Sequence, residues 1–103
     1  HHQAHQRNHF HQAGAGTTQL VAAGGAGNKI KVVSYTFTLS AAGTAKFTGT
    51  ADLTGTFDIA ANGGLVCNSQ PSSPLFETAG NAALSIVTTG GQAEGHISYF
   101  IEA

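Results

Sequence analysis

Apolar and polar side chains alternate with a period of two residues along most of the chain, and turn residues interrupt the alternation. This pattern is typical of β-strands with one buried face. It predicts short strands at residues 17–22, 29–39, 45–50, 54–59, 65–68, 75–78, 83–88 and 94–101. Turn signals recur about every eight to twelve residues, and no segment has convincing helical periodicity. The chain is therefore predicted to be all-β, an antiparallel β-sandwich and most simply a jelly roll.

The strongest predicted strand, residues 29–39, changes its apolar face midway. One face carries Val33, Tyr35, Phe37 and Leu39, whereas Ile30 and Val32 occupy the other. A strand with this pattern either contains a β-bulge or is covered on both faces. The second alternative needs a neighbouring subunit, and it places Ile30 and Val32 in a subunit interface.

The sequence ANGG at residues 61–64 is either a phosphate-binding loop or a tight turn. A phosphate loop is followed by a helix whose N-terminus faces the anion. Residues 65–74, LVCNSQPSSP, contain two prolines and cannot form that helix. Asn followed by Gly is instead a strong signal for the turn of a β-hairpin, because both residues tolerate positive φ. We therefore predict a hairpin turn.

The first sixteen residues, HHQAHQRNHFHQAGAG, contain almost no aliphatic side chain. We predict an N-terminal arm at residues 1–16 and a β-sandwich domain at residues 17–103. Such an arm orders only against a partner, because it lacks the apolar surface to offset its conformational entropy. The residues expected to contact that partner are His5, Arg7, His9, Phe10 and His11. The histidine spacings can bind Zn²⁺ or Ni²⁺, but the flanks offer no fixed partners, so no metal site is predicted.

Composition narrows the classes of partner. Only 9% of the residues are charged, whereas an average domain has about 25%. A surface of Thr, Ser, Asn, Gln, Ala and Gly indicates oligomerisation or a place in a large assembly. The net charge of −1 and the scattered lysines argue against nucleic-acid binding. No apolar run approaches the length of a membrane span, about 20 residues, so no membrane partner is predicted.

Residues with catalytic chemistry form no constellation in the sequence. The single Cys67 has no Cys or His signature around it, and it is interpreted as a structural thiol. A cupin-type metal enzyme needs His-x-His, a carboxylate and a further His on strands. Only His96 lies on a predicted strand, because His9 and His11 belong to the predicted arm. We therefore predict no enzyme and no cofactor, and we assign His96, Ser98 and Phe100 to one face of a trimer interface.

From Ala23 to its end the chain resembles small β-sandwich proteins of tailed phages and prophages, the trimeric head-decoration (cement) proteins with a tumour-necrosis-factor-like jelly roll. The resemblance depends on five motifs and their order: KIKVV at 29–33, AANGG at 60–64, FETA at 76–79, NAALSI at 81–86 and GHISY at 95–99. The His-rich N-terminal residues depart from this pattern.

The resemblance implies a virion structural protein without catalytic residues. Such a bacteriophage protein forms a homotrimer on the outer surface of the capsid head and clamps neighbouring major capsid proteins against internal pressure. An alternative is a phage tail, fibre or surface module that binds a host glycan or protein. Exposed aromatic residues clustered on loops are the feature expected of that alternative.

Overall fold

The structure, a computed structural model, describes residues 6–12, 14–68 and 74–102, and for Cys67 and Asn68 it describes the backbone alone. Within these residues the chain forms β-strands and no helix, so no helix is long and apolar enough to cross a membrane. The strands are β1 (Gln6–Gln12), β2 (Gly16–Val21), β3 (Lys29–Leu39), β4 (Gly43–Thr48), β5 (Phe57–Ile59), β6 (Gly64–Asn68), β7 (Phe76–Glu77), β8 (Leu84–Thr89) and β9 (Ala93–Glu102). All eight predicted strands are present, and β1 is an addition.

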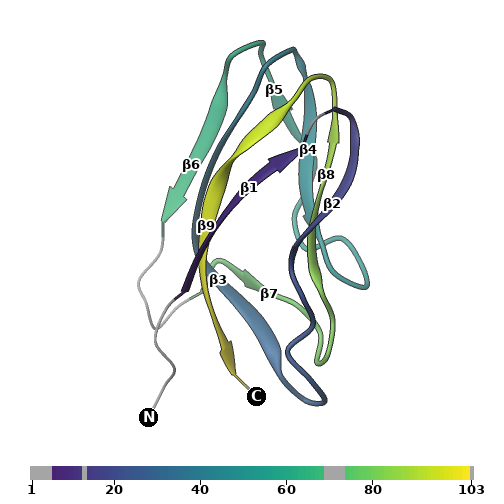
Figure 1. Ribbon diagram of the computed structural model, residues 1–103, viewed down its shortest axis with the longest axis vertical. Helices are drawn as coiled ribbons and strands as arrows, with labels where there is room; N and C mark the ends of the chain where they lie inside the picture. Colours follow the sequence, from purple (N-terminus) through teal and green to yellow (C-terminus); the bar gives the residue numbers. More distant parts are fainter. Residues whose placement is uncertain (1–5, 13, 69–73, 103) are drawn as a thin grey trace.

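The strands form two antiparallel sheets packed face to face. Sheet A has the order β1-β9-β3-β6, with the short β7 also pairing with β3, and sheet B has the order β2-β8-β4-β5. In Figure 1 sheet A lies on the left and sheet B on the right. The strand pairs β1–β9, β2–β8, β3–β6 and β4–β5 are each antiparallel and hydrogen-bonded. Strands from the first half of the chain therefore pair with strands from the second half, in reverse order. This arrangement is a jelly roll, as the sequence predicts.

A β-bulge in β3 resolves the change of apolar face. The register of β3 against β9 shifts between Val32 and Ser34, and the extra residue turns the following side chains to the opposite face. Ile30 and Val32 therefore join Tyr35, Phe37 and Leu39 in the core between the sheets. Ile30 and Val32 are 0% exposed in the single chain. They belong to its core rather than to the subunit interface predicted for them.

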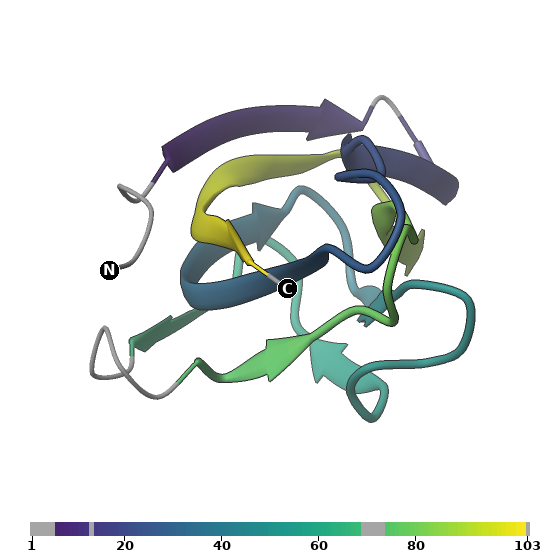
Figure 2. The same ribbon diagram turned by 90° about the horizontal axis from the view of Figure 1, so that it is seen from below.

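Strand β1 corrects the prediction of an arm outside the sandwich. Gln6–Gln12 pairs along its whole length with β9 and forms one edge of sheet A; Figure 2 shows it beyond β9. Phe10 is 9% exposed and belongs to the hydrophobic core. Gln12 is also buried, and its Nε2 donates hydrogen bonds to Thr88 Oγ1 of sheet B and to the Gly14 carbonyl. One aromatic ring and one buried amide therefore anchor a segment that is otherwise polar.

The ANGG segment forms a turn, but the turn does not close a hairpin. Asn62 has a positive φ of 61°, and the Gly63 amide donates to the Ala60 carbonyl at 2.9 Å. The flanking strands lie in different sheets, β5 in sheet B and β6 in sheet A. Hydrogen bonds between Leu39 and residues 62 and 63 hold the turn against the end of β3. The turn chemistry was predicted correctly, and the pairing of its flanking strands was wrong.

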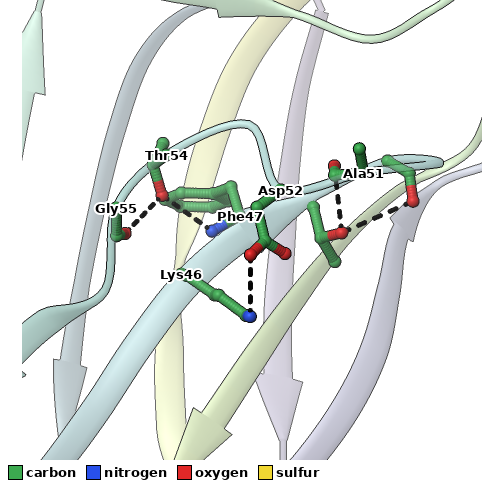
Figure 3. A network of polar contacts seen from close by, with 8 residues as sticks. Lys46, Phe47, Ala51, Asp52, Thr54 and Gly55 are labelled. Atoms are coloured by element: carbon green, nitrogen blue, oxygen red, sulfur yellow. Dashed lines mark hydrogen bonds and ion pairs between the residues drawn. The ribbon is translucent and has the colours of Figure 1, made fainter.

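Side-chain hydroxyls and an ion pair order the loop between β4 and β5 (Figure 3). The Phe47 amide donates to Thr54 Oγ1, which in turn donates to the Gly55 carbonyl. Lys46 Nζ lies 3.1 Å from Asp52 Oδ2, and the Leu53 amide donates to the Phe47 carbonyl. The loop therefore folds back onto β4 and does not extend away from sheet B.

Candidate functional site

The outer face of sheet A, directed away from sheet B, carries most of the ionisable side chains. Alternation along paired strands places every second residue on this face. Strand β1 contributes Arg7, His9 and His11, β9 contributes Glu94, His96, Ser98, Phe100 and Glu102, and β3 contributes Lys29 and Lys31. Ion pairs join β3 to its neighbouring strands on this face. Lys31 Nζ lies 3.2 Å from Glu102 Oε1 of β9, and Lys29 Nζ lies 3.0 Å from Glu77 Oε2 of β7.

A cluster that we name the histidine patch comprises His9, His11, Glu94 and His96. His9 lies directly opposite His96 in the β1–β9 register, and His11 lies directly opposite Glu94. The imidazole centres of His9 and His96 are 5.6 Å apart, with the rings tilted by 41°. His11 Nδ1 lies 2.8 Å from Glu94 Oε1. Because a carboxylate only accepts hydrogen bonds, Nδ1 carries the proton in this contact.

The histidine patch lines an open hollow of about 410 Å³, with Phe10 and Gly95 completing the lining. The side chains of His11 and Glu94 are 50% and 67% exposed. A side-chain contact with this exposure contributes little to stability, about 0–1 kcal/mol even between charged groups. The contact therefore orients the imidazole of His11 more than it stabilises the fold.

Gly95 and Phe10 determine how closely β1, β9 and β3 approach beneath the patch. A Cβ at Gly95 would lie 2.0 Å from the Thr36 carbonyl oxygen and 2.6 Å from Phe37 Cα. Phe10 lies opposite Gly95 in the register, and its ring centre is 6.4 Å from that of Phe37. The small residue therefore permits the close packing that fixes the backbone on which His96 and Glu94 stand.

The sequence-predicted site residues separate into two groups. Arg7, His9 and His11 lie on the outer face of β1, next to His96 and Ser98 on β9. Phe10 points to the core, and Phe100 is only 6% exposed, with Lys31 Nζ 6.0 Å from its ring centre. His5 lies outside the described residues. The structure thus brings members of the predicted arm and of the predicted interface together on one surface.

Glu94 was missed as a partner of the histidines. The signal that could have found the patch is the alternation in QRNHFHQ, where Phe10 and Gln12 face one side and Arg7, His9 and His11 the other. The alternation is a weak signal in the sequence because only one large apolar residue, Phe10, supports it. Because β1 is a strand, His9-x-His11, Glu94 and His96 all stand on strands. They are the residue types that the sequence analysis required of a cupin-type site. Here they stand on the outside of the sandwich.

In the part of the chain that the structure describes, no three His, Cys, Asp or Glu side chains converge on one point as metal ligands would. The patch consists instead of two adjacent cross-strand pairs, one of two imidazoles and one of an imidazole and a carboxylate. This arrangement offers hydrogen-bond donors, acceptors and nitrogen lone pairs to a molecule or ion that approaches from solvent.

The chain matches no family model and no curated protein. Among solved structures, it is similar to a pilus subunit of Bacillus endospore appendages, described as a novel family of disulfide-linked pili. That match has a TM-score of 0.52 and 13% identity, and it covers 95% of this chain and 84% of the other. At this identity the likeness shows the fold alone.

Two further structures match with a TM-score of 0.45 and 10% identity. One is the C-terminal CBM6 of LamC, a marine laminarinase from Zobellia galactanivorans, and the match covers 96% of this chain and 92% of that chain. The other is a chain from the virus-like particle of Macrobrachium rosenbergii extra small virus, and the match covers 96% of this chain and 80% of that chain. Both matches lie below the similarity at which a fold comparison supports an argument.

Proposed function

We propose that the chain is a virion structural protein, a phage capsid decoration (cement) protein that trimerises and clamps neighbouring major capsid proteins on the outer surface of the head. The observation that carries the proposal is a jelly roll in which sheet B has a broad, polar outer face that is poor in charge. On sheet B the outer face consists of Thr17, Gln19, Thr44, Lys46, Thr48, Asp58, Ser85, Val87 and Thr89. Faces of this kind suit flat contact with other protein better than they suit catalysis.

The resemblance of the sequence to trimeric cement proteins supports the same proposal, and the jelly-roll topology is the one that it implies. A solved structure of similar fold belongs to disulfide-linked pili, and at 13% identity this likeness supports the β-sandwich fold alone. No enzyme activity is proposed.

The trimer contact that we propose is the outer face of sheet A around His96 and Ser98. Ile30 and Val32, which the sequence assigned to the interface, are buried in the core of the single chain and are not part of the proposed contact. Strand β6, the edge of sheet A on the far side of β3, adds Val66, which is 71% exposed and is the large exposed hydrophobic residue among those described. A polar face with an apolar residue at its margin is compatible with an interface between copies of the chain.

A glycan- or protein-binding module of a tail or fibre, the alternative from the sequence, lacks the feature expected of it. The chain has six Phe, two Tyr and no Trp. All eight of these aromatic residues fall within the described residues, and each is buried or half-buried. Without an exposed ring in this part of the chain, the alternative has no observation in its favour.

The test is sedimentation of the purified protein alone and with capsid shells assembled from the major capsid protein of the same genome. We expect a trimer that co-sediments with shells. A folded monomer at micromolar concentration, or a trimer that stays in the supernatant, contradicts the proposal.

A matched pair of variants locates the contact. His96→Asp introduces a carboxylate near its symmetry mates in the proposed interface, where burial of like charges is costly. Gln19→Asp introduces the same group on the exposed outer face of sheet B. The first should weaken the trimer and the second should not. Equal trimer stability in the two variants would place the contact elsewhere.

A further inference from the structure

We propose that the edge strand β6 (Gly64–Asn68) pairs antiparallel with β6 of a second copy of the chain, so that sheet A continues from one copy into the next. The contact is isologous, with its two-fold axis at Val66. It is separate from the proposed trimer contact around His96 and Ser98, because those residues stand on β9, and β3 lies between β9 and β6. The inference does not depend on the proposed role in a capsid.

Val66 directs its backbone N–H and C=O away from sheet A, at the left margin of the molecule in Figure 1. Successive residues of an antiparallel strand direct these groups to alternate sides. Leu39 of β3 directs its own toward the β6 side, since it is hydrogen-bonded to residues 62 and 63, and Phe37 therefore does the same. Leu65, the register partner of Phe37, faces β3 with its backbone groups, so those of Val66 point outward. Among the described residues, no backbone hydrogen bond covers this outer side.

Strand β6 lacks the features that usually prevent edge strands from pairing. Natural sheets protect their edges with charged side chains, with proline, or with very short strands. The other edge of sheet A, β1, carries an arginine and two histidines. Strand β5 at one edge of sheet B has three residues and includes Asp58, and β7 has two residues and includes Glu77. Strand β6 has five residues, GLVCN, without charge and without proline.

The remaining edge strand, β2, is also uncharged, but it is interrupted and partly covered. Its register against β8 shifts between Gln19 and Val21, and such an irregularity disrupts the regular edge that another strand needs. Asn8 Nδ2 of β1 donates to the Leu20 carbonyl at 3.0 Å. Strand β6 is therefore the edge best suited to accept another strand.

The side chain of Val66 gains burial from this pairing. Val66 lies opposite Thr36, which in turn lies opposite His96, so all three stand on the outer face of sheet A. Val66 is 71% exposed in the single chain. With the two-fold axis at this position, the two Val66 side chains lie directly opposite each other on the same face, with Cβ atoms about 5 Å apart. Each then covers apolar surface of the other.

A second copy is the partner that the strand itself fits. In this register Gly64 of one copy lies opposite Asn68 of the other and Val66 lies opposite Val66, so each outward-directed backbone position meets another outward-directed position. Because β6 carries no charge, pairing with its own copy brings no like charges together. The same pairing of β1 with β1 would oppose cationic and titratable side chains of the same kind. The neutral edge therefore favours self-association.

The first test is chemical crosslinking of the full chain through a single thiol. Cys67→Ser removes the natural thiol, and Val66→Cys in that background places one thiol at the proposed axis. Cα atoms of a hydrogen-bonded antiparallel pair are about 5.5 Å apart, so a short bismaleimide should join two copies into a covalent dimer at micromolar concentration. Gln19→Cys in the same background, at an exposed position of edge strand β2, is the control and should stay uncrosslinked. Equal crosslinking of the two variants, or none at position 66, would overturn the pairing.

The second test is the mass of the particle in analytical ultracentrifugation. Val66→Pro removes an outward N–H and leaves the β3–β6 ladder intact, a position where sheets tolerate proline. It should fold as the wild type does and halve the mass of the particle, and Val66→Lys should do the same. Gln19→Lys should leave the mass unchanged. His96→Asp, which addresses the trimer contact, should leave crosslinking at position 66 in place, so the two contacts fail independently. An unchanged mass of folded Val66→Pro would contradict the pairing.

Discussion

The outer faces of the two sheets differ although both arise from the same alternation of polar and apolar residues. Among the described residues, the face of sheet A carries two of the three ion pairs between lysine and a carboxylate, both with lysines of β3, together with the histidine patch and its contact between His11 and Glu94. The face of sheet B is mostly threonine, serine and glutamine, and its ion pair, Lys46 with Asp52, closes the loop after β4. Alternation thus determines that a face is solvated, but not what that face can do.

The difference originates in β1. Without that strand, sheet A would end at β9, and His96 and Glu94 would stand alone at an edge. Strand β1 (Gln6–Gln12) adds a second row of ionisable side chains beside those of β9. The ring centres of His9 and His96 lie 5.6 Å apart, and His11 is hydrogen-bonded to Glu94. The candidate site therefore exists only because β1, anchored by Phe10, pairs with β9.

The largest expected effect comes from breaking the packing beneath sheet A. Gly95→Ala should destabilise the fold by about 3 kcal/mol or more, because the new Cβ meets backbone atoms that cannot move aside as a side chain could. The measurement is urea-induced unfolding. Gly55→Ala in the loop of sheet B is the control, since a Cβ there meets nothing within 4 Å. Similar stabilities for the two variants would show that β9 and β3 are less closely packed than described.

Next in size is the loss of the anchor of β1. Phe10→Ala should cost about 3 kcal/mol, the usual range for removing a buried Phe, because its ring packs on Phe37 and the core. Chemical denaturation gives the value. If residues 6–12 formed a free arm, as the sequence suggested, the cost would be close to zero.

A smaller effect is expected at the polar link between the sheets. Thr88→Val keeps the shape of the buried side chain and removes the hydroxyl that accepts from Gln12 Nε2 at 2.8 Å. Loss of one buried hydrogen bond should cost about 1 kcal/mol. Thr88→Ser keeps the hydroxyl and should retain the hydrogen bond, so double-mutant cycles with Gln12→Ala separate the bond from the packing. Additive effects in the cycle would mean that the link is not formed.

The sequence predicted the sandwich well because its signal is local. Period two within 29–39 or 83–88 reflects one buried face, and the bulge in β3 could be named as one of two alternatives from the switch at Val32. Sheet membership could not be predicted in this way. The turn at Asn62-Gly63 has the chemistry of a hairpin, yet it joins two sheets, because the partner of each strand depends on contacts distant in sequence.

The candidate site was harder to predict because neither of its halves signals function alone. His9 and His11 resemble part of a polar tail, and Glu94 and His96 resemble the solvated face of a strand. Only the register that sets His9 against His96 and His11 against Glu94 makes them one cluster. That register depends on burying Phe10 and Gln12, two residues in a segment whose composition otherwise indicates disorder.

The smallest expected effect on stability gives the sharpest comparison between the faces. Glu94→Ala on sheet A and Asp52→Ala on sheet B each remove a carboxylate from an exposed side-chain contact. Each should change the free energy of unfolding by less than about 1 kcal/mol, because exposed pairs contribute little. The measurement is urea-induced unfolding of both variants beside the wild type. A loss well above about 1 kcal/mol for Glu94→Ala but not for Asp52→Ala would mean that the contact between Glu94 and His11 fastens β1 to β9 and does more than orient the imidazole.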